Sequence, residues 1–335
     1  MNNRIALVGG CGFIGHNLAI SLKESGFEPI IIDSLSINNL YSLTELKEDN
    51  QNLYQTILNS RINILKKKNI KLLIQDSRDY HSMSKILSDI KPIKLIHLAA
   101  VSHANKSNKD PHSTFDNSLR TLENSLDFCK SNNTHIIYFS SSMVYGNFKT
   151  KSVNEETVCN PLGIYGNLKY SGELMVKSYN QVFELPYTII RPSALYGERC
   201  VSRRVGQIFI ENSLLGKELF IDGDGEECLD FTYIKDFVDG VVLCCKKKEA
   251  INQTFNLTYG ESRPINDLIK LIKKNFNNIE VIYKERDKLN PIRGTLEIAK
   301  AKKLIGYVPK YSIDVGYQNY IDWYKDFWSQ NFGNL

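Results

Sequence analysis

Short apolar runs recur along the first part of the chain and alternate with stretches in which apolar residues are spaced like one face of a helix. Each run has five to seven residues and is rich in Ile, Leu or Val, which is typical of strands buried on both faces of a parallel sheet. The predicted strands are residues 4–8, 29–33, 71–76, 95–100, 135–141 and 187–191. After the first strand, Ile14, Leu18 and Leu22 recur every four residues and predict a helix with one apolar stripe. This alternation predicts an α/β fold.

The second part of the chain is expected to add one more strand to the sheet and a smaller group of elements beside it. An apolar helix around residues 237–245 and a strand at 254–257 would return to the sheet. The other predicted elements are a helix with Ile208, Leu214 and Leu215, a helix at 265–276, a strand around 281–283, and an aromatic helix with Tyr317, Tyr320, Tyr324 and Trp328. Residues 36–69 are longer than a usual connection and predict an inserted helical segment, which could cover a substrate or contact another subunit.

The composition is that of an ordinary soluble protein. Of 335 residues, 42% are hydrophobic and 24% charged, and 42 basic against 37 acidic residues give a net charge of +5. This modest excess argues against nucleic-acid binding but fits an anionic small substrate. The seven cysteines lack the paired spacing of a disulfide framework and no C-x-x-C occurs, so we expect no metal. Without a signal region or an apolar stretch of roughly 18 residues, we expect no membrane contact and a cytoplasmic location.

A glycine-rich segment links the first predicted strand to its helix. Its glycines lie at positions 9, 12 and 15, and the second strand ends in Asp33. Glycines in this place let the backbone approach a dinucleotide pyrophosphate, which the amides at the helix start bind. Asp33 can accept hydrogen bonds from a ribose diol and would repel a 2′-phosphate, so NAD is favoured over NADP. The predicted cofactor residues here and after the following strands are Gly9, Gly12, Phe13, Ile14, Gly15, Asp33, Asp76, Ser77, Leu98, Ala99 and Ala100.

These features predict a Rossmann-like, doubly wound parallel sheet with a smaller C-terminal substrate-binding lobe. We expect residues 1–195, completed by about 232–258, to form the NAD-binding domain. Residues 196–231 and 259–335 would form the lobe. A substrate is expected in the crevice between the two, at the carboxyl ends of the strands.

Tyr165 and Lys169 are four residues apart, which places them one above the other on one face of a helix. An ammonium group in that place favours the ionised phenol, and a tyrosine with an ordinary pKa of about 10 needs such a neighbour to act as a base near neutral pH. A core ring beside a snorkelling lysine stem would give the same spacing. The catalytic interpretation is favoured by the glycine-rich segment and by a serine run, Ser140 to Ser142, that ends a predicted strand.

Further motifs follow in a fixed order over about residues 4–240. They are Leu98-Ala99-Ala100, Asn117, the segment from Ser140 to Gly146, Tyr165 with Lys169, Arg191-Pro192, Tyr196-Gly197, and the segment from Asp230 to Ile234. With them, the chain resembles the extended short-chain dehydrogenase/reductase family, in particular its NAD-dependent nucleotide-sugar epimerase/dehydratase branch. The resemblance implies that Tyr165 is the base, that Lys169 lowers its pKa and holds the nicotinamide ribose, and that Ser141 bonds the reacting hydroxyl.

The resemblance also implies an NAD cofactor that Asn117 helps to bind, and a homodimer. Asn117 is expected to open a helix with Leu119, Leu122 and Leu126 on one face. In the family, this helix and the helix of Tyr165 form a four-helix interface between two subunits.

The residues after Ser141 indicate the reaction. In the family's sugar 4,6-dehydratases an Asp-Glu pair follows, whereas this chain has Ser142 and Met143, and a methionine cannot exchange a proton. The favoured function is therefore an NAD-dependent nucleotide-sugar epimerase, acting at C4 through a 4-keto intermediate with the hydride returned by the bound cofactor. A dehydrogenase, 4-keto reductase or dehydratase of the same family is the alternative. A non-catalytic NAD-binding sensor is a remote one, because such members tend to lose the tyrosine or lysine.

Two departures from the family pattern concern the substrate's diphosphate. Leu229 stands where the family usually has an arginine, and Ala194 where it commonly has an asparagine. A leucine cannot neutralise phosphate, so other cations must do so. The candidates for binding a nucleotide-diphosphate sugar are His103, Ser141, Ser142, Arg199, Arg203, Arg204 and Arg286, with Arg293 next. For each arginine, a solvated surface role is the alternative.

Overall fold

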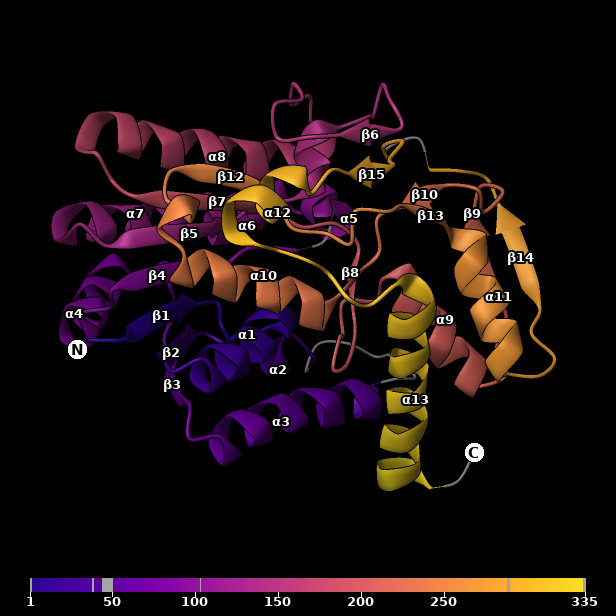
Figure 1. The fold of residues 1–335 in the computed structure, drawn as a ribbon. Coiled ribbons are helices and arrows are strands. Elements are labelled where there is room, and N and C mark those ends of the chain that lie inside the picture. Colours follow the sequence, from indigo (N-terminus) through magenta and orange to yellow (C-terminus); the bar gives the residue numbers. More distant parts are fainter. Residues whose placement is uncertain (1, 38, 44–50, 103, 288–289, 334–335) are drawn as a thin grey trace.

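The computed structural model describes residues 2–37, 39–43, 51–102, 104–287 and 290–333. At its centre lies a sheet of seven parallel strands in the order β3-β2-β1-β4-β5-β7-β12 (Figure 1). The strands are β1 (Arg4–Val8), β2 (Glu28–Asp33), β3 (Lys71–Ile74), β4 (Lys94–His97), β5 (His135–Phe139), β7 (Tyr187–Arg191) and β12 (Gln253–Asn256). The chain winds outward from β1 in both directions, which confirms the predicted doubly wound α/β fold.

Alternate residues of each strand supply two separate cores, as the pleat of a strand requires. In β1, Ile5 and Leu7 belong to one core, and Ala6 and Val8 belong to the other. The helices that cover the first core are α1 (Phe13–Glu24), α3 (Gln51–Lys67) and α10 (Ile234–Lys246), and those that cover the second are α4 (Tyr80–Ile90), α7 (Thr121–Asn132) and α8 (Gly163–Phe183). The central strands are therefore buried on both faces, which explains their continuous apolar runs, whereas the edge strand β3 is partly exposed.

Three strands, β3, β4 and β5, end before their apolar runs do, so the predicted boundaries at 76, 100 and 141 are too late. The amides of Leu98 and Ala99 both donate to the carbonyl of Val8, which turns the chain out of the sheet. Ser141 caps a short 3-10 helix, η2 (Ser142–Tyr145), with its hydroxyl. The predicted site residues therefore lie in loops at the carboxyl edge of the sheet.

Asn117 lies within a helix and does not open one, which corrects the predicted start. The helix begins at Pro111, because Asp110 accepts a hydrogen bond from the Ser113 amide and proline fits the first helical position. Its first segment, α6 (Pro111–Phe115), continues through a π-helical turn, η1 (Asp116–Arg120), into α7. Turns of this kind occur frequently at functional sites.

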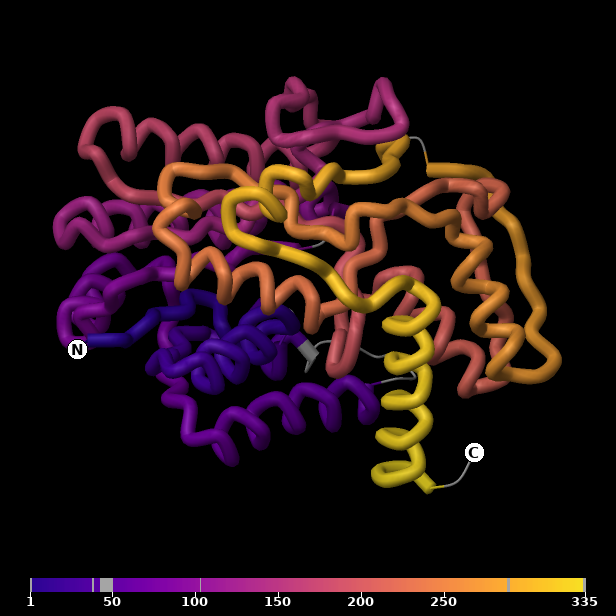
Figure 2. Tube along the Cα trace, viewed as in Figure 1, coloured from indigo at the N-terminus to yellow at the C-terminus, as the bar shows by residue number. Residues whose placement is uncertain are grey.

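The C-terminal elements form a smaller group beside the sheet (Figure 1). They are α9 (Val205–Leu214), β9 (Leu219–Asp222), α11 (Ile265–Asn275), β14 (Val281–Lys284) and α13 (Ile313–Phe332). In α13, Tyr317, Tyr320 and Tyr324 are fully buried. The orange segment 234–256 instead runs back along the sheet, where α10 packs on α1 and β12 pairs with β7 (Figure 2). The domain boundary near residue 195 stays a prediction.

The described helices of the inserted segment link the sheet to the C-terminal elements. The long helix of the segment, α3, lies next to α1. The hydroxyl of Tyr54 on α3 donates to Glu211 of α9 at 2.7 Å, and Tyr324 of α13 donates to the same carboxylate at 2.7 Å. This buried carboxylate therefore connects three helices that are far apart in the sequence.

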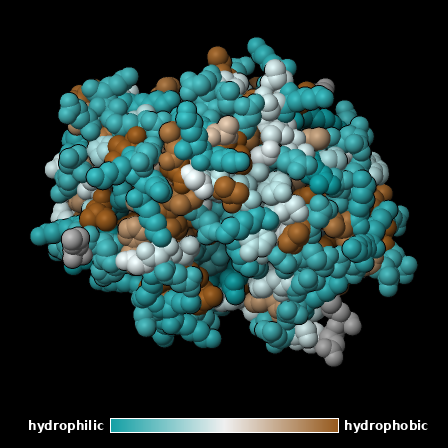
Figure 3. Space-filling model, viewed as in Figure 1, coloured by the Kyte–Doolittle hydropathy of each residue, from teal (hydrophilic) through white to brown (hydrophobic). Residues whose placement is uncertain are grey.

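Shorter elements connect these parts. They are α2 (Leu40–Leu43), α5 (Ala104–Lys109), β6 (Ser152–Val153), β8 (Leu195–Tyr196), β10 (Cys228–Leu229), β11 (Thr232–Tyr233), η3 (Lys248–Ala250), β13 (Arg263–Pro264), β15 (Thr295–Leu296) and α12 (Ala299–Ile305). The face seen in Figure 3 is mostly hydrophilic, with apolar residues in separate patches. Among the helices that the structure describes, none is long and apolar enough to cross a membrane.

Candidate active site

A cavity of about 600 Å³ lies at the carboxyl edge of the sheet and is closed on its other side by the C-terminal elements. The residues from strand ends, from the loops that follow them and from the adjoining helices α1, η1 and α8 form what we call the sheet side. It contains Gly9, Gly12, Phe13, Ile14, Gly15, Asp33, Asp76, Ser77, Leu98, Ala99, Ala100, Asn117, Ser141, Ser142, Tyr165 and Lys169. The structure thus brings together, around one space, all the residues predicted for the cofactor and for catalysis.

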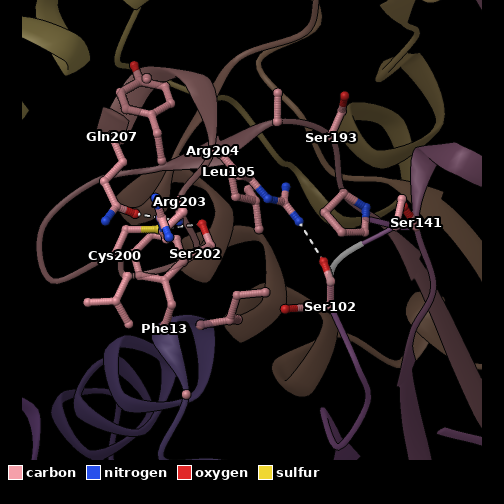
Figure 4. A pocket seen from close by; sticks show the side chains of 18 of the residues that line it. Phe13, Ser102, Ser141, Ser193, Leu195, Cys200, Ser202, Arg203, Arg204 and Gln207 are labelled. Atoms are coloured by element: carbon pink, nitrogen blue, oxygen red, sulfur yellow. Dashed lines mark hydrogen bonds between the residues drawn. The ribbon is translucent and has the colours of Figure 1, made fainter. Parts of the chain in front are cut away.

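The opposite wall, here the lobe side, comes from loops that are distant in the sequence. It contains Cys200, Val201, Ser202, Arg203, Arg204, Ile221, Glu227, Leu229, Asn290 and Arg293. Figure 4 shows Phe13 of the sheet side and the loop residues Cys200 and Ser202 around the same cavity.

The glycine-rich turn is built so that the backbone itself faces the cavity. Gly9 has a positive φ of 78°, and a Cβ at Gly15 would lie 2.4 Å from the Gly10 carbonyl oxygen, so side chains are excluded from both. At Gly12 a Cβ would meet only the Gly9 oxygen, at 3.6 Å, and would enter open space. Helix α1 begins there without a side-chain cap and without an acid in its first turn. Its first amides are therefore available to an anion, which fits a dinucleotide diphosphate.

Asp33 holds this turn in place from the end of β2. Its carboxylate accepts hydrogen bonds from the amides of Cys11 at 2.8 Å and Leu35 at 2.7 Å. Burial raises the pKa of Asp33, and the two amides oppose that shift. Each carboxylate oxygen keeps further acceptor capacity, so the residue fits a ribose diol as well as supporting the loop.

Two further predicted residues occupy fixed positions on the sheet side. Asp76 forms an ion pair with Arg78 at 2.6 Å, and hydrogen bonds from Arg78 lower the pKa of Asp76. Asn117 lies in the π-helical turn, and its amide nitrogen donates to the Ser113 carbonyl at 2.8 Å. That bond directs the Asn117 side chain along the helix, next to the cavity that it lines.

The three predicted catalytic residues line the cavity on its sheet side. Ser141 follows β5, and Tyr165 and Lys169 lie one turn apart on α8. The Lys169 ammonium donates to the Phe139 carbonyl at 2.7 Å and lies 5.4 Å from the centre of the Tyr138 ring. Burial lowers the pKa of Lys169 to about 8, and Glu173 on the same helix opposes the shift. A lysine held in this way is a fixed, partly desolvated charge beside the tyrosine.

A buried ion pair fixes α8 against the sheet. Glu173 and Arg191 of β7 are 2.7 Å apart, and both are almost fully buried. The hydroxyl of Ser140 donates to Glu173, and Arg191 also donates to the Tyr145 hydroxyl at 2.9 Å. Because these bonds join the end of β5, η2 and α8, they hold Ser141 and the Tyr165 helix in one arrangement.

On the lobe side, Arg204 and Arg293 line the cavity, and Arg293 lies near the carboxylate of Glu227. The Arg204 guanidinium donates to the Ser102 carbonyl at 3.3 Å (Figure 4). Arg293 lies 3.7 Å from Glu227, and burial lowers the pKa of Arg293 while Glu227 opposes that shift. Arg203 also lines this wall, and its amide donates to Gln207.

Two of the predicted substrate arginines do not line the cavity. The backbone of Arg199 has a positive φ of 64°, and its guanidinium lies over the Trp323 ring, 5.8 Å from the ring centre. The Arg286 guanidinium donates to the Asn290 carbonyl and lies 4.0 Å from Glu227. Both are therefore directed to neighbouring protein groups. His103 lies outside the described residues.

Sequence reasoning missed several cavity residues. Arg61 lies in the inserted segment, which was expected to cover a substrate or to contact another subunit, and Glu227 and Asn290 come from loops without a recognisable motif. A signal for Arg61 was present, because it follows Leu58 by three residues on the buried face of α3, where an apolar residue is expected. In the part of the chain that the structure describes, no group of three or more His, Cys, Asp or Glu side chains could hold a metal.

A doubly wound parallel sheet, a glycine-rich turn before α1 and a Ser-Tyr-Lys set on one cavity define a dinucleotide-binding protein of the short-chain dehydrogenase type. The chain belongs to the NAD dependent epimerase/dehydratase family, whose sequence model matches residues 5–258. This match confirms the resemblance drawn from the motifs.

The relatives cover almost the whole chain. It is 30% identical over 323 residues to an uncharacterized UDP-glucose epimerase of Bacillus subtilis, covering 95% of this chain and 96% of the relative. It is 29% identical over 331 residues to a putative UDP-glucose 4-epimerase of Methanocaldococcus jannaschii, and this match covers 96% of this chain and 98% of the relative. Among solved structures, UDP-glucuronic acid 4-epimerase from Bacillus cereus, in complex with UDP-glucuronic acid and NAD, matches with a TM-score of 0.86 and 28% identity. That match covers 96% of this chain and 99% of the other.

Proposed function

We propose that this protein is an NAD-dependent nucleotide-sugar epimerase that inverts the configuration at C4 of the sugar. The observation that carries the proposal is that Ser141, Tyr165 and Lys169 line one cavity together with the glycine-rich turn and with arginines of the lobe side. A cavity with these groups could hold a dinucleotide beside the turn and a second ligand beside the arginines, and we propose that the three side chains act where the two ligands adjoin.

Each of the three residues has a distinct part. Tyr165 takes the proton of the 4-hydroxyl, and Ser141 hydrogen-bonds the same oxygen as negative charge develops on it. Lys169, fixed by the Phe139 carbonyl, supplies a positive charge one helical turn from Tyr165. When NAD is bound, its nicotinamide ring would accept a hydride from C4 of the sugar and afterwards return it to the opposite face of that carbon. Tyr165 then returns the proton, so the reaction consumes no cofactor.

The substrate is a nucleotide-diphosphate sugar, with UDP as the proposed nucleotide. The named relatives are UDP-sugar epimerases, and the B. cereus structure holds UDP-glucuronic acid. Arg204 and Arg293 supply positive charge on the lobe side, where Leu229 leaves none. Arg203 lines the same wall and is the third proposed contact, whereas the positions of Arg199 and Arg286 do not support direct binding.

Met143 favours epimerisation over the family's other reactions. It lines the cavity directly after the Ser141-Ser142 pair, and its thioether cannot donate or accept a proton in the elimination of water. The dehydratase alternative is therefore disfavoured. A dehydrogenase or keto reductase would use the same three residues but would consume NAD or NADH with each turnover.

We further propose that two copies associate through α7 and α8, which pack against each other on the surface of the sheet domain. Large apolar side chains of α8 are exposed, with Leu174 at 48%, Phe183 at 49% and Val182 at 70%. Four helices, two from each copy, would cover them. Light scattering after size-exclusion chromatography should give twice the chain mass, and Leu174→Glu should give the chain mass.

A cytoplasmic location is proposed from the cysteine chemistry. All seven cysteines are free. Burial raises the pKa of four of them, Cys11, Cys129, Cys244 and Cys245, so these side chains stay in the unreactive thiol form. Free buried thiols fit a reducing compartment.

The direct test is to incubate the protein and NAD with UDP-glucose, UDP-N-acetylglucosamine or UDP-glucuronic acid and to follow the sugar protons by NMR. At least one of these substrates should give its 4-epimer without accumulation of NADH. Absence of any epimer with all three, under conditions in which NAD is bound, would refute the proposed function.

A further inference from the structure

A buried arginine of the inserted segment lines the cavity without an acidic partner. Arg61 of α3 is 1% exposed and shares the cavity wall with Gly12 and Asp33. Its Nη1 atom is buried and has no hydrogen-bond partner. Within the described residues, Arg61 forms no ion pair with a carboxylate. An uncompensated buried charge destabilises a fold, so an anion is expected to complete this site.

The titratable groups that interact with Arg61 are Cys200, whose thiol contacts the Ser202 hydroxyl, together with Cys11, Tyr320, Asp33 and His16. His16 is buried beside Arg61, and burial together with the Arg61 charge holds the pKa of His16 well below its usual value, so the imidazole is neutral. Burial raises the pKa of Cys11 to about 11 and that of Tyr320 well above its usual value, so both are neutral at physiological pH. Asp33 interacts with Arg61 through its charge but forms no ion pair with it among the described residues, and its oxygens accept hydrogen bonds from the amides of Cys11 and Leu35.

The Arg61 guanidinium is fixed before any ligand arrives. Its Nε and Nη2 atoms both donate to the carbonyl of Arg199, with the Nε contact at 3.0 Å. This fork-like contact uses one edge of the planar guanidinium and leaves Nη1 on the other side. The loop that supplies the carbonyl is the one that carries Arg203 and Arg204 to the lobe side. Arg61 therefore connects the inserted helix, the cavity wall and the substrate loop.

We propose that Arg61 is a binding residue for the diphosphate of the dinucleotide, supplied by the inserted segment from outside the glycine-rich turn. The inference rests on the proposed function in that NAD is the cofactor. Arg61 interacts with Cys200 and Tyr320 of the lobe as well as with Cys11 and His16 of the glycine-rich turn and α1. The cofactor's diphosphate is preferred over the substrate's because Arg61 lines the cavity together with Gly12, where the first amides of α1 carry no side-chain cap. Amides and guanidinium would hold the diphosphate from two directions.

Isothermal titration of NAD-depleted protein tests this directly, with NAD, ADP-ribose and adenosine as ligands. Arg61→Met should raise the Kd for NAD and for ADP-ribose roughly 10- to 100-fold, the value of a charged hydrogen bond. The Kd for adenosine, which lacks phosphate, should not change. Lys67→Met is the matched control, since it removes a charge from the exposed side of the same helix and should leave all three constants as in the unmodified protein.

Arg61→Lys keeps the charge but cannot reach both the Arg199 carbonyl and a phosphate, so its Kd for NAD should lie between those of the unmodified protein and Arg61→Met. Arg61→Lys also keeps the NAD titration possible if Arg61→Met does not fold. Equal loss of affinity for adenosine and ADP-ribose would overturn the proposal in favour of a purely structural arginine. Unchanged NAD affinity in either variant would also overturn it and leave the epimerase function intact, whereas failure of the unmodified protein to bind NAD would count against that function itself.

Discussion

The sheet side of the cavity presents backbone amides and short side chains at strand ends, whereas the lobe side presents long cationic side chains from loops far apart in the sequence. On the sheet side, the positions of Gly12, Asp33 and Ser141 follow from local turns. On the lobe side, Arg293 and Glu227 meet only because separate loops fold together. The difference indicates a cofactor site that is specified locally and a substrate site that depends on the packing of the whole lobe.

The largest effect is expected where the two sides meet. Tyr165→Phe removes the proposed base and should lower kcat roughly 10³-fold, within the range known for general acid–base catalysis. NAD affinity should stay near that of the unmodified protein, because the ring and its packing are kept. Tyr170→Phe is the matched control on the same helix, since Tyr170 packs against a separate apolar cluster. A Tyr165→Phe enzyme with unaltered kcat would refute the assignment of the base.

The lobe side should also depend on pH through a buried carboxylate. Asp230 accepts hydrogen bonds from Thr258, Gly260 and Leu296, yet burial raises its pKa to about 7. Because the folded pKa exceeds the unfolded one, folding favours the protonated form, and this stabilising contribution is lost as pH rises through 7. Between pH 5 and pH 8 the free energy of unfolding should fall by on the order of 3 kcal/mol from this group.

Urea denaturation at the two pH values measures this contribution. In Asp230→Asn the side chain no longer titrates. The decrease in the free energy of unfolding between pH 5 and pH 8 should therefore be smaller than in the unmodified protein by about 3 kcal/mol. The exposed Asp326→Asn is the control and should show the full fall. The same pH dependence in Asp230→Asn and in the unmodified protein would contradict the account.

Removing one lobe-side cation should affect substrate binding more than chemistry. Arg293→Met should raise KM for the nucleotide sugar roughly 10-fold or more, the value of a charged hydrogen bond, with a small change in kcat. NAD affinity should not change, because Arg293 belongs to the other wall. Arg120→Met, on the surface ion pair with Asp116, is the control. A loss of NAD affinity in Arg293→Met would mean that the two sides are not separate.

The smallest effect on ligand binding is expected from a single methyl group added at Gly12 in the glycine-rich turn. Gly12→Ala should keep the melting temperature and weaken NAD binding several-fold, because the added Cβ enters open cavity. Gly15→Ala should destabilise the fold by about 1–3 kcal/mol, the usual range for overpacking, since its Cβ would lie 2.4 Å from the Gly10 oxygen. Thermal melts and NAD titrations of the two variants distinguish these outcomes. Equal destabilisation by both would contradict the geometry of the turn.

The sequence was sufficient for the sheet, the glycine-rich turn and the residues at the strand ends, because each depends on local periodicity or a local turn. It misplaced the start of the helix around Asn117, since the cap at Asp110 and the proline after it lie upstream of the apolar stripe. It could not place Arg199, whose left-handed backbone directs the side chain to Trp323. Nor could it pair Glu227 with Arg293, because that contact depends on how distant loops pack.

The most direct measurement uses a nucleotide sugar that carries deuterium at C4, turned over with catalytic NAD and followed by NMR together with the absorbance of reduced nicotinamide. The account predicts the 4-epimer with deuterium retained at C4 and no net NADH, because the transferred hydride returns to the carbon that lost it. Replacement of the deuterium by solvent hydrogen, or formation of NADH in proportion to product, would contradict it.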